Sequence, residues 1–217
     1  MADPFEITFS FRNQRFTDAS AGLRAFATAL KRDWNGAAGV LSQEMRDFLN
    51  GVAQALASRH GNAWPGGTGA RSLSKRSGAL VSAIVGSVKV NGTTFTTIEG
   101  SIGAPGVAYA KIQETGGMIK PKSAKFLCIP LPAALDGNGL PLRASPRQWE
   151  NTFVATSKAG NLIIFQKRAS TIVPLYVLKD EVTIPPRLGM GDTLRAGLPY
   201  FVDHAVAAIM KAMRDKR

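Results

Sequence analysis

The stretch Val107–Leu131, VAYAKIQETGGMIKPKSAKFLCIPL, carries the densest structural signals in this chain. Apolar residues at near-helical spacing predict a short helix over Val107–Thr115. Gly116-Gly117 ends it, because a glycine pair supplies the positive φ of a helix C-cap or tight turn. Lys120-Pro121-Lys122 then forms a rigid basic turn, and Phe126–Leu131 is predicted to be a buried strand ended by prolines. This helix–turn–strand corner with lysines at its lip is either a binding surface or a folding corner.

The composition is that of a globular protein with excess positive charge. Hydrophobic residues make up 45% of the 217 residues, and the longest apolar runs are far shorter than the ~20 residues that span a bilayer. The first residues lack the pattern of a secretory signal, and the single Cys128 fits a reducing compartment. The net charge is +12, and residues 48–98 and 151–179 contain no acid. This basic surface suits an acidic partner or DNA phosphate, or it is merely solvated.

The two ends of the chain are predicted to be mainly helical. Phe5–Phe11 alternates apolar and polar residues and is predicted to be a half-buried strand. Thr17-Asp18 can cap the helix that follows, whose apolar stripe runs to about Arg59. Asn35-Gly36 would kink this helix or split it into a pair. A last amphipathic helix opens at Met190-Gly191-Asp192 and ends in basic residues, which are favourable to the helix dipole.

The middle of the chain is predicted to contain loops and antiparallel strands. Gly61–Leu73 is a Gly-rich loop, and Ser77–Gly86 a short helix. Asn91-Gly92 between β-branched runs predicts a hairpin over Ser87–Ile102. Ala133–Asn151 lacks periodicity and is either a surface excursion or an arm that orders on a neighbour. Further strands are predicted over Phe153–Ser157, Leu162–Lys167, Ile172–Leu178 and Val182–Ile184.

These elements predict the α+β fold class. We expect a largely antiparallel twisted sheet packed by the long N-terminal helix, or helix pair, and the C-terminal helix. Residues 1–217 are predicted to form a single domain, with a Gly-rich loop at 61–73 and a loop or arm at 133–151.

Catalytic motifs are missing from the sequence, so we expect no enzyme, no cofactor and no metal site. Cys128 lies in the middle of a predicted strand, where a buried, inert thiol is the common arrangement. His60, Cys128 and His204 lack the spacing of metal ligands, and the Gly-rich loop lacks the ending of a phosphate-binding P-loop. Glu114 is the one acid in the corner, and its expected role is a salt bridge or a helix-end hydrogen bond.

Three pieces of the sequence together carry a family resemblance. The corner follows the order small–Tyr–Ala–x–Ile–x–Glu–x–Gly–Gly with Tyr109, Ala110, Ile112, Glu114, Gly116 and Gly117. Arg76-Ser77-Gly78-Ala79-Leu80 lies upstream, and Ile184-Pro185-Pro186-Arg187 precedes the final helix. In this order they resemble tail-completion and neck proteins of tailed bacteriophages, among them the Mu-like virion morphogenesis proteins and lambdoid minor tail proteins. Gln113 stands where that family commonly has His, and Leu188-Gly189 replaces its usual Pro-Phe.

The resemblance implies a structural virion protein that works without chemistry. Such a subunit closes into a homo-oligomeric ring at the tail end, as a terminator, or at the head–tail junction, as a neck protein. The ring would be six-fold to match the tail, would contact tail-tube and head–tail connector proteins, and would let DNA pass. The protein would reside in the virion, and in the host cytoplasm during assembly, with no membrane contact. The corresponding motif residues are Tyr109, Glu114, Gly116, Gly117, Pro185 and Arg187.

Aromatic and basic side chains of the loops are the candidate interaction residues: Trp64, Arg71, Lys75, Arg76, Lys120, Lys122, Lys125, Arg143, Arg147 and Trp149. Trp64 either folds onto the core edge or contacts a partner. The three lysines around Pro121 form a docking patch for an acidic partner, or a merely soluble turn. The loops 61–73 and 133–151 are expected to contact neighbouring subunits. The alternative function is a basic nucleic-acid-binding protein, which would interleave aromatic with basic residues or present a recognition helix.

Overall fold

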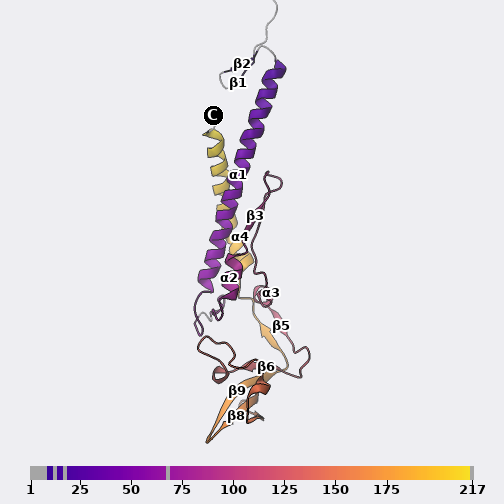
Figure 1. Cartoon of the computed structure of the whole chain (residues 1–217), viewed down its shortest axis with the longest axis vertical. Coiled ribbons are helices and arrows are strands. Elements are labelled where there is room, and N and C mark those ends of the chain that lie inside the picture. The colour runs from indigo at the N-terminus through magenta and orange to yellow at the C-terminus, as the bar shows by residue number, and fades with distance from the viewer. Residues whose placement is uncertain (1–8, 12–13, 17–18, 67–68, 216–217) are drawn as a thin grey trace, which may run out of the picture. The chain divides into compact units, whose positions relative to one another are not determined.

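The computed structural model describes residues 9–11, 14–16, 19–66 and 69–215, and it confirms the α+β class (Figure 1). Its helices are α1 (Ala19–Arg59), α2 (Ala79–Val85), α3 (Ala110–Thr115) and α4 (Met190–Arg214), with 3-10 turns η1 (Pro132–Ala134) and η2 (Pro146–Gln148). Its strands are β1 (Phe9–Phe11), β2 (Gln14–Phe16), β3 (Lys89–Asn91), β4 (Glu99–Ser101), β5 (Gly117–Ile119), β6 (Leu127–Pro130), β7 (Thr152–Thr156), β8 (Leu162–Arg168), β9 (Thr171–Lys179) and β10 (Val182–Ile184). Among the helices of the described residues, none has the length and apolar character that a bilayer crossing requires.

The chain divides into two compact units where the sequence predicts a single domain. Unit 1 comprises residues 1–52, 88–102 and 194–217, and unit 2 comprises residues 53–87 and 103–193. The boundaries between the units fall inside α1 and inside α4 as well as at the two ends of the β3–β4 segment. Each unit is therefore assembled from segments that are far apart in the sequence.

Helix α1 is one continuous helix of 41 residues, so of the two predicted arrangements the single long helix forms and not the helix pair. Ala37 and Ala38 follow Asn35-Gly36 and are each 1% exposed. Their tertiary packing offsets the helix penalty of a glycine, about 1 kcal/mol. The proposed cap Thr17-Asp18 and residues 5–8 of the predicted N-terminal strand lie outside the described residues; the rest of that strand is β1, which pairs with β2.

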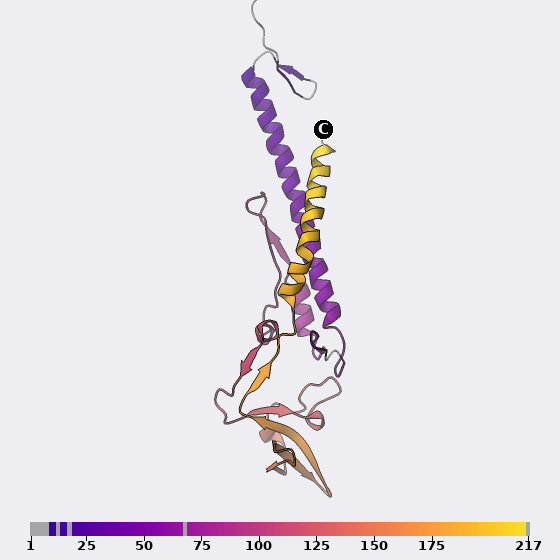
Figure 2. The same cartoon turned by 180° about the vertical axis from the view of Figure 1, so that it is seen from behind.

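In unit 1, α4 lies alongside α1 (Figure 2). A Cβ added to Gly197 of α4 would lie 2.7 Å from the Phe48 ring of α1. The Phe48 ring stacks on Phe201, with centroids 5.0 Å apart. Ala205 follows one turn later and is only 4% exposed. The i, i+4 series Gly197, Phe201 and Ala205 is thus the face of α4 that this unit buries.

The β3–β4 hairpin of unit 1 confirms the predicted hairpin but not its turn. Asn91 pairs with Glu99, so Asn91-Gly92 opens a longer loop and not a two-residue turn. Inside this loop the Thr97 N–H donates to the Thr94 carbonyl at 3.0 Å, and the Thr94 N–H donates to the Thr97 hydroxyl at 3.1 Å. Threonine side chains that bond to nearby backbone compete with regular turns, which is why the Asn-Gly signal fails here.

Unit 2 contains a four-stranded antiparallel sheet of order β6-β9-β8-β7 and a two-stranded sheet of β5 and β10. The strands predicted for one sheet are therefore divided among separate antiparallel sheets. Pro174 of β9 lies opposite Phe165 beside a register shift between Ile164 and Phe165, where the ladder tolerates a residue without an N–H. Trp149 packs against the buried core of the larger sheet, which consists of Ala134, Leu175 and Tyr176.

Cys128 of β6 is exposed, so the prediction of a buried thiol is wrong. The apolar neighbours of Cys128 suggest burial, but β6 is an edge strand of its sheet and is not covered on all sides. Partial desolvation raises the pKa of the Cys128 thiol, which keeps it protonated at neutral pH.

Candidate functional site

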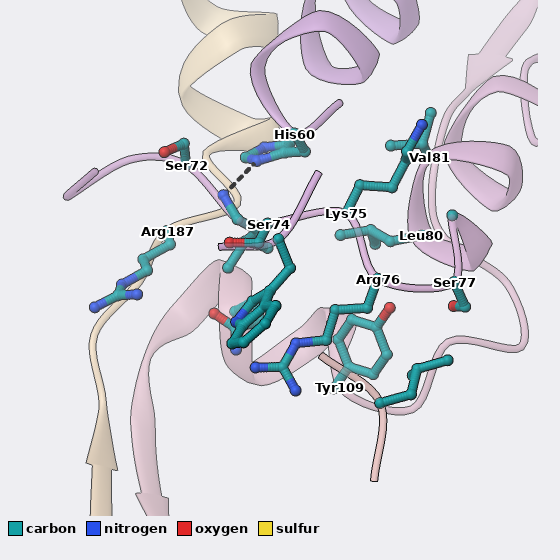
Figure 3. Close-up of a pocket in the computed structure, with 15 residues that line it drawn as sticks. His60, Ser72, Ser74, Lys75, Arg76, Ser77, Leu80, Val81, Tyr109 and Arg187 are labelled. Atoms are coloured by element: carbon teal, nitrogen blue, oxygen red, sulfur yellow. Dashed lines mark hydrogen bonds between the residues drawn. The ribbon is translucent and has the colours of Figure 1, made fainter. Parts of the chain in front are cut away.

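Unit 2 contains a pocket of about 420 Å³, a size typical of ligand sites (Figure 3). The pocket is built by the end of α1, the loop that follows it, α2, the start of α3 and two single residues from other loops. Its lining is His60, Trp64, Ser72, Leu73, Ser74, Lys75, Arg76, Ser77, Gly78, Leu80, Val81, Tyr109, Gln113, Leu140 and Arg187. In Figure 3, Arg187 and Ser72 lie at one end of the pocket, and Ser77 and Val81 at the other.

The three sequence pieces that carry the family resemblance meet at this pocket. The upstream piece contributes Arg76, Ser77, Gly78 and Leu80, the corner contributes Tyr109 and Gln113, and the last piece contributes Arg187. The pocket therefore brings predicted interaction residues, Trp64, Lys75 and Arg76, together with predicted motif residues, Tyr109 and Arg187. The order of these pieces along the chain does not reveal this proximity; the fold does.

A tight joint connects the corner to the last of these pieces. The Gln113 carbonyl accepts hydrogen bonds from the Arg187 N–H at 2.7 Å and the Leu188 N–H at 2.8 Å. Gly116 has a φ of 68°, and a Cβ added there would lie 2.9 Å from Cδ of Pro186. Gly116 is therefore required by its backbone conformation and by close packing, and its predicted role as the end of α3 is confirmed. Pro185, next to this joint, is exposed.

The carboxylate of Glu114 binds the first turn of α4. Its Oε2 accepts from the Met190 N–H and its Oε1 from the Gly191 N–H, each at 2.8 Å. The N–H groups at a helix start lack partners within the helix, and the helix dipole favours a negative charge there. Of the two roles predicted for Glu114, the helix-end hydrogen bond is the one that forms. The helix that it caps is α4 and not its own helix, α3.

His60 joins three segments at the wall of the pocket. Its side chain belongs to a residue that is 1% exposed, its Nε2 lies 3.0 Å from the Leu188 carbonyl, and its Nδ1 accepts from the Leu73 N–H at 3.1 Å. The accepting Nδ1 places the proton on Nε2, so the neutral ring satisfies both contacts. Burial lowers the pKa of His60 and the nearby Arg59 lowers it further, against the opposing effect of the Leu188 bond. His60 is a neutral structural residue.

We expect the free energy of unfolding to fall as the pH is lowered below about 6.5, the ordinary pKa of histidine. The folded pKa of His60 is lower than this value, so the unfolded chain binds the proton first and is favoured by acid, with a slope of at most ~1.4 kcal/mol per pH unit. Urea unfolding of the wild type and of His60→Gln at pH 7.5, 6 and 5 measures this. His204→Gln is the control because His204 is exposed. An equal acid dependence in wild type and His60→Gln would contradict the assignment.

Trp64 packs against a loop of its own unit, and its contact with a partner stays a prediction. A Cβ on Gly139 would lie 2.6 Å from Cδ2 of Trp64, so the loop backbone touches the ring. The Arg76 guanidinium lies 5.9 Å from the ring centroid and donates to the Gly139 carbonyl at 2.6 Å. Ala134 of the same loop is fully buried. Residues 133–151 are therefore a surface excursion folded onto unit 2, and their contact with neighbouring subunits stays a prediction.

The lining of the pocket is positively charged. None of its lining residues is an acid, and Lys75, Arg76 and Arg187 have no carboxylate partner among the described residues. Two polar atoms next to it, Oε1 of Gln113 and Nε of Arg187, are buried without a hydrogen bond. Within the part of the chain that the structure describes, no three His, Cys, Asp or Glu side chains gather as a metal site would need.

The lysine lip of the corner is partly neutralised by the chain itself. Lys120 forms an ion pair with Glu181 at 3.2 Å, and Lys125 lies 5.3 Å from the centroid of the Phe126 ring. Lys122 is exposed. The pairing of β5 with β10 brings Glu181 to the lip, which the sequence around Pro121 does not reveal. The docking role of this lip stays a prediction.

A second basic cluster lies on unit 2 at the larger sheet. Arg143 and Trp149, both predicted as interaction residues, are joined there by Arg168, whose guanidinium also lies against the Trp149 ring. The prediction missed Arg168, although it lies in the acid-free stretch 151–179. We call the cluster the Trp149 patch, defined as Trp149, the two arginines at its ring, Arg143 and Arg168, and Arg147, which lies two residues before Trp149 in η2. Arg71 is exposed and belongs to neither site.

Comparison of the chain with protein-family models, with curated proteins and with solved structures gives no match. The resemblance to phage tail-completion and neck proteins therefore stays a prediction from the sequence.

Proposed function

We propose that this chain is a structural subunit of a tailed-phage virion, one that completes the tail or joins head to tail as a homo-oligomeric ring. The phage context comes from the three sequence pieces, whose residues share one pocket and one joint in unit 2. The observation that carries the assembly is an exposed apolar ridge on α4. The expected partners are further copies of the chain, in six-fold number, and tail-tube and connector proteins.

The ridge consists of Leu198, Val202, Val206 and Met210, which are between 48% and 56% exposed. Side chains four residues apart form one continuous ridge on a helix, about 18 Å long here at ~1.5 Å per residue. The sequence assigns Leu198 and Val202 to the same stripe as Phe201 and Ala205. In unit 1 only the latter two face α1, and the neighbouring ridge is left open to water.

An apolar ridge of this length is costly to leave in water and is typical of a protein–protein contact. Completing the burial of four half-exposed side chains contributes about 3–6 kcal/mol before the costs of association are counted. The ridge also runs along a rigid helix, which keeps the ordering cost of an interface low. If it meets a different surface on the next copy, the contact is heterologous, and repetition of it closes a ring.

Val202→Glu/Val206→Glu is the variant that tests the proposal. Two charges on the ridge would have to be desolvated in an interface, so we expect the variant to stay monomeric while wild type forms rings. Light scattering gives the mass, electron microscopy shows the rings, and circular dichroism checks that helix content is unchanged.

Ala196→Glu/His204→Glu is the matched control, because both residues are exposed on α4 and neither is three or four residues from a ridge residue. It adds the same charge to the same helix and is expected to assemble like wild type. Wild-type protein that is monomeric at all concentrations, or rings that persist in Val202→Glu/Val206→Glu, would contradict the proposal.

A further inference from the structure

The Trp149 patch is built on a fixed aromatic ring. Trp149 packs against the buried core of the larger sheet, and its Nε1–H donates to the Tyr176 hydroxyl at 3.1 Å. Tyr176 is 3% exposed, so this partner belongs to the core. The indole is therefore held in one position, and it restricts the positions of the side chains that pack against it.

Two arginines lie against this ring. The guanidinium carbons of Arg143 and Arg168 are 5.9 and 6.0 Å from the ring centroid, within the range of a cation–π contact. Nε of Arg168 donates to Oε1 of Gln166 at 2.6 Å, and Nε2 of Gln166 donates to the Glu150 carbonyl at 3.1 Å. The Arg168 fork is thus oriented before any partner arrives, which lowers the entropy cost of binding.

The charge around the ring is nearly all of one sign. Residues 137–179 contain one acid, Glu150, and six basic residues, Arg143, Arg147, Lys158, Lys167, Arg168 and Lys179. The three cations of the Trp149 patch are exposed, and within the described residues none of them forms an ion pair with a carboxylate. Like charges held this close repel one another, so a partner dense in negative charge stabilises the arrangement.

We propose that the Trp149 patch binds the phosphate backbone of double-stranded DNA without regard to base sequence. All three of its cations are arginines, whose planar forks match phosphate oxygens in pairs. The Trp149 ring is anchored to the core and flanked by guanidinium groups. Its role is to order those groups, and it makes no base-specific contact. Basic and aromatic residues of this patch therefore lie next to one another in the folded chain, although the sequence does not place them side by side. The inference rests on the patch of one subunit and does not require assembly into a homo-oligomeric ring.

The test is the salt dependence of DNA binding, measured by fluorescence anisotropy with a labelled random-sequence duplex. The variant Arg143→Gln/Arg147→Gln/Arg168→Gln removes three cations of the patch. The slope of log K against log salt is negative, and each lost phosphate contact makes it less steep by about 0.9, so we expect its magnitude to decrease by up to about 2.7. Thermal unfolding and the Trp emission spectrum show whether the variant keeps the fold.

Lys120→Gln/Lys122→Gln/Lys125→Gln is the charge-matched control. It removes the same number of cations from unit 2 at the lysine lip, and we expect its slope to stay within about one contact, ~0.9, of wild type. A second variant, Arg143→Lys/Arg168→Lys, keeps the charge and loses the forks. It should keep the salt slope and bind DNA more weakly than wild type.

Equal losses in the two triple variants would show that only net charge matters and would overturn the proposal. Poly-glutamate that competes as well as unlabelled duplex would assign the patch to an acidic protein and would also overturn it. Light scattering on the same samples reports ring formation, whereas anisotropy reports DNA binding. A failure of the DNA-binding proposal is therefore distinguished from a failure of the ring proposal.

Discussion

Replacing Glu114 with alanine is expected to lower the free energy of unfolding by about 2–4 kcal/mol. The substitution removes both hydrogen bonds to the first turn of α4, at Met190 and Gly191, and a bond to a charged group contributes about 1.5–3 kcal/mol. It also leaves two helix-end N–H groups without an acceptor and removes a negative charge from the positive end of the dipole. Urea unfolding followed by circular dichroism at neutral pH measures the change.

Glu150→Ala is the matched control for this substitution. Glu150 is exposed, and such surface changes stay within about 0.5 kcal/mol. Glu114→Gln retains one acceptor oxygen and should fall between wild type and Glu114→Ala. A loss below about 0.5 kcal/mol in Glu114→Ala would show that water replaces the carboxylate at no cost.

Gly139→Ala is expected to destabilise unit 2 by about 2–4 kcal/mol, through left-handed strain and overpacking together. The residue has a φ of +75°, and an added Cβ would lie 2.6 Å from Cδ2 and 2.7 Å from Cγ of Trp64. The indole is rigid and cannot bend away as an aliphatic chain would. Displacement of the loop would also break the bond from Arg76 to the Gly139 carbonyl.

Gly137→Ala provides the control two residues earlier in the same loop. No atom lies within 4 Å of a Cβ built there, so the change should be neutral or slightly stabilising. Differential scanning calorimetry compares the two variants directly. Equal melting temperatures for Gly139→Ala and wild type would show that the loop does not rest on Trp64.

Local signals predict most of the elements, because helices, strands and caps depend on neighbours in the sequence. The apolar stripe of α1, the Gly116 stop after α3 and the strands β7 to β10 follow from periodicity and glycine alone. The failures arise where a distant or competing contact decides. The Thr97 hydroxyl replaces the Asn-Gly turn, and the edge position of β6 exposes Cys128.

The candidate sites show the same limit more strongly. A glutamate in the last turn of α3 looks misplaced, because its partners lie 76 and 77 residues away at α4. His60 looks like an ordinary helix-end residue until Leu188, 128 residues later, supplies its acceptor. Arg143 and Trp149 are recognisable from the sequence, but Arg168 joins them only after the β8 strand folds back along the sheet.

The division into two interleaved units sets the order in which this chain can mature on the ribosome. Unit 2 has all its segments once residue 193 is translated, whereas unit 1 waits for the part of α4 that follows. Residues 60–189 separate α1 from α4, and at about 5–20 residues per second their synthesis takes roughly 6–26 seconds. Throughout that interval α4 is not yet present to cover the face of α1 that contains Phe48. Nascent chains on one polysome therefore expose this apolar face of α1 to one another, which favours aggregation. A chaperone that binds the face early would raise the yield of native protein.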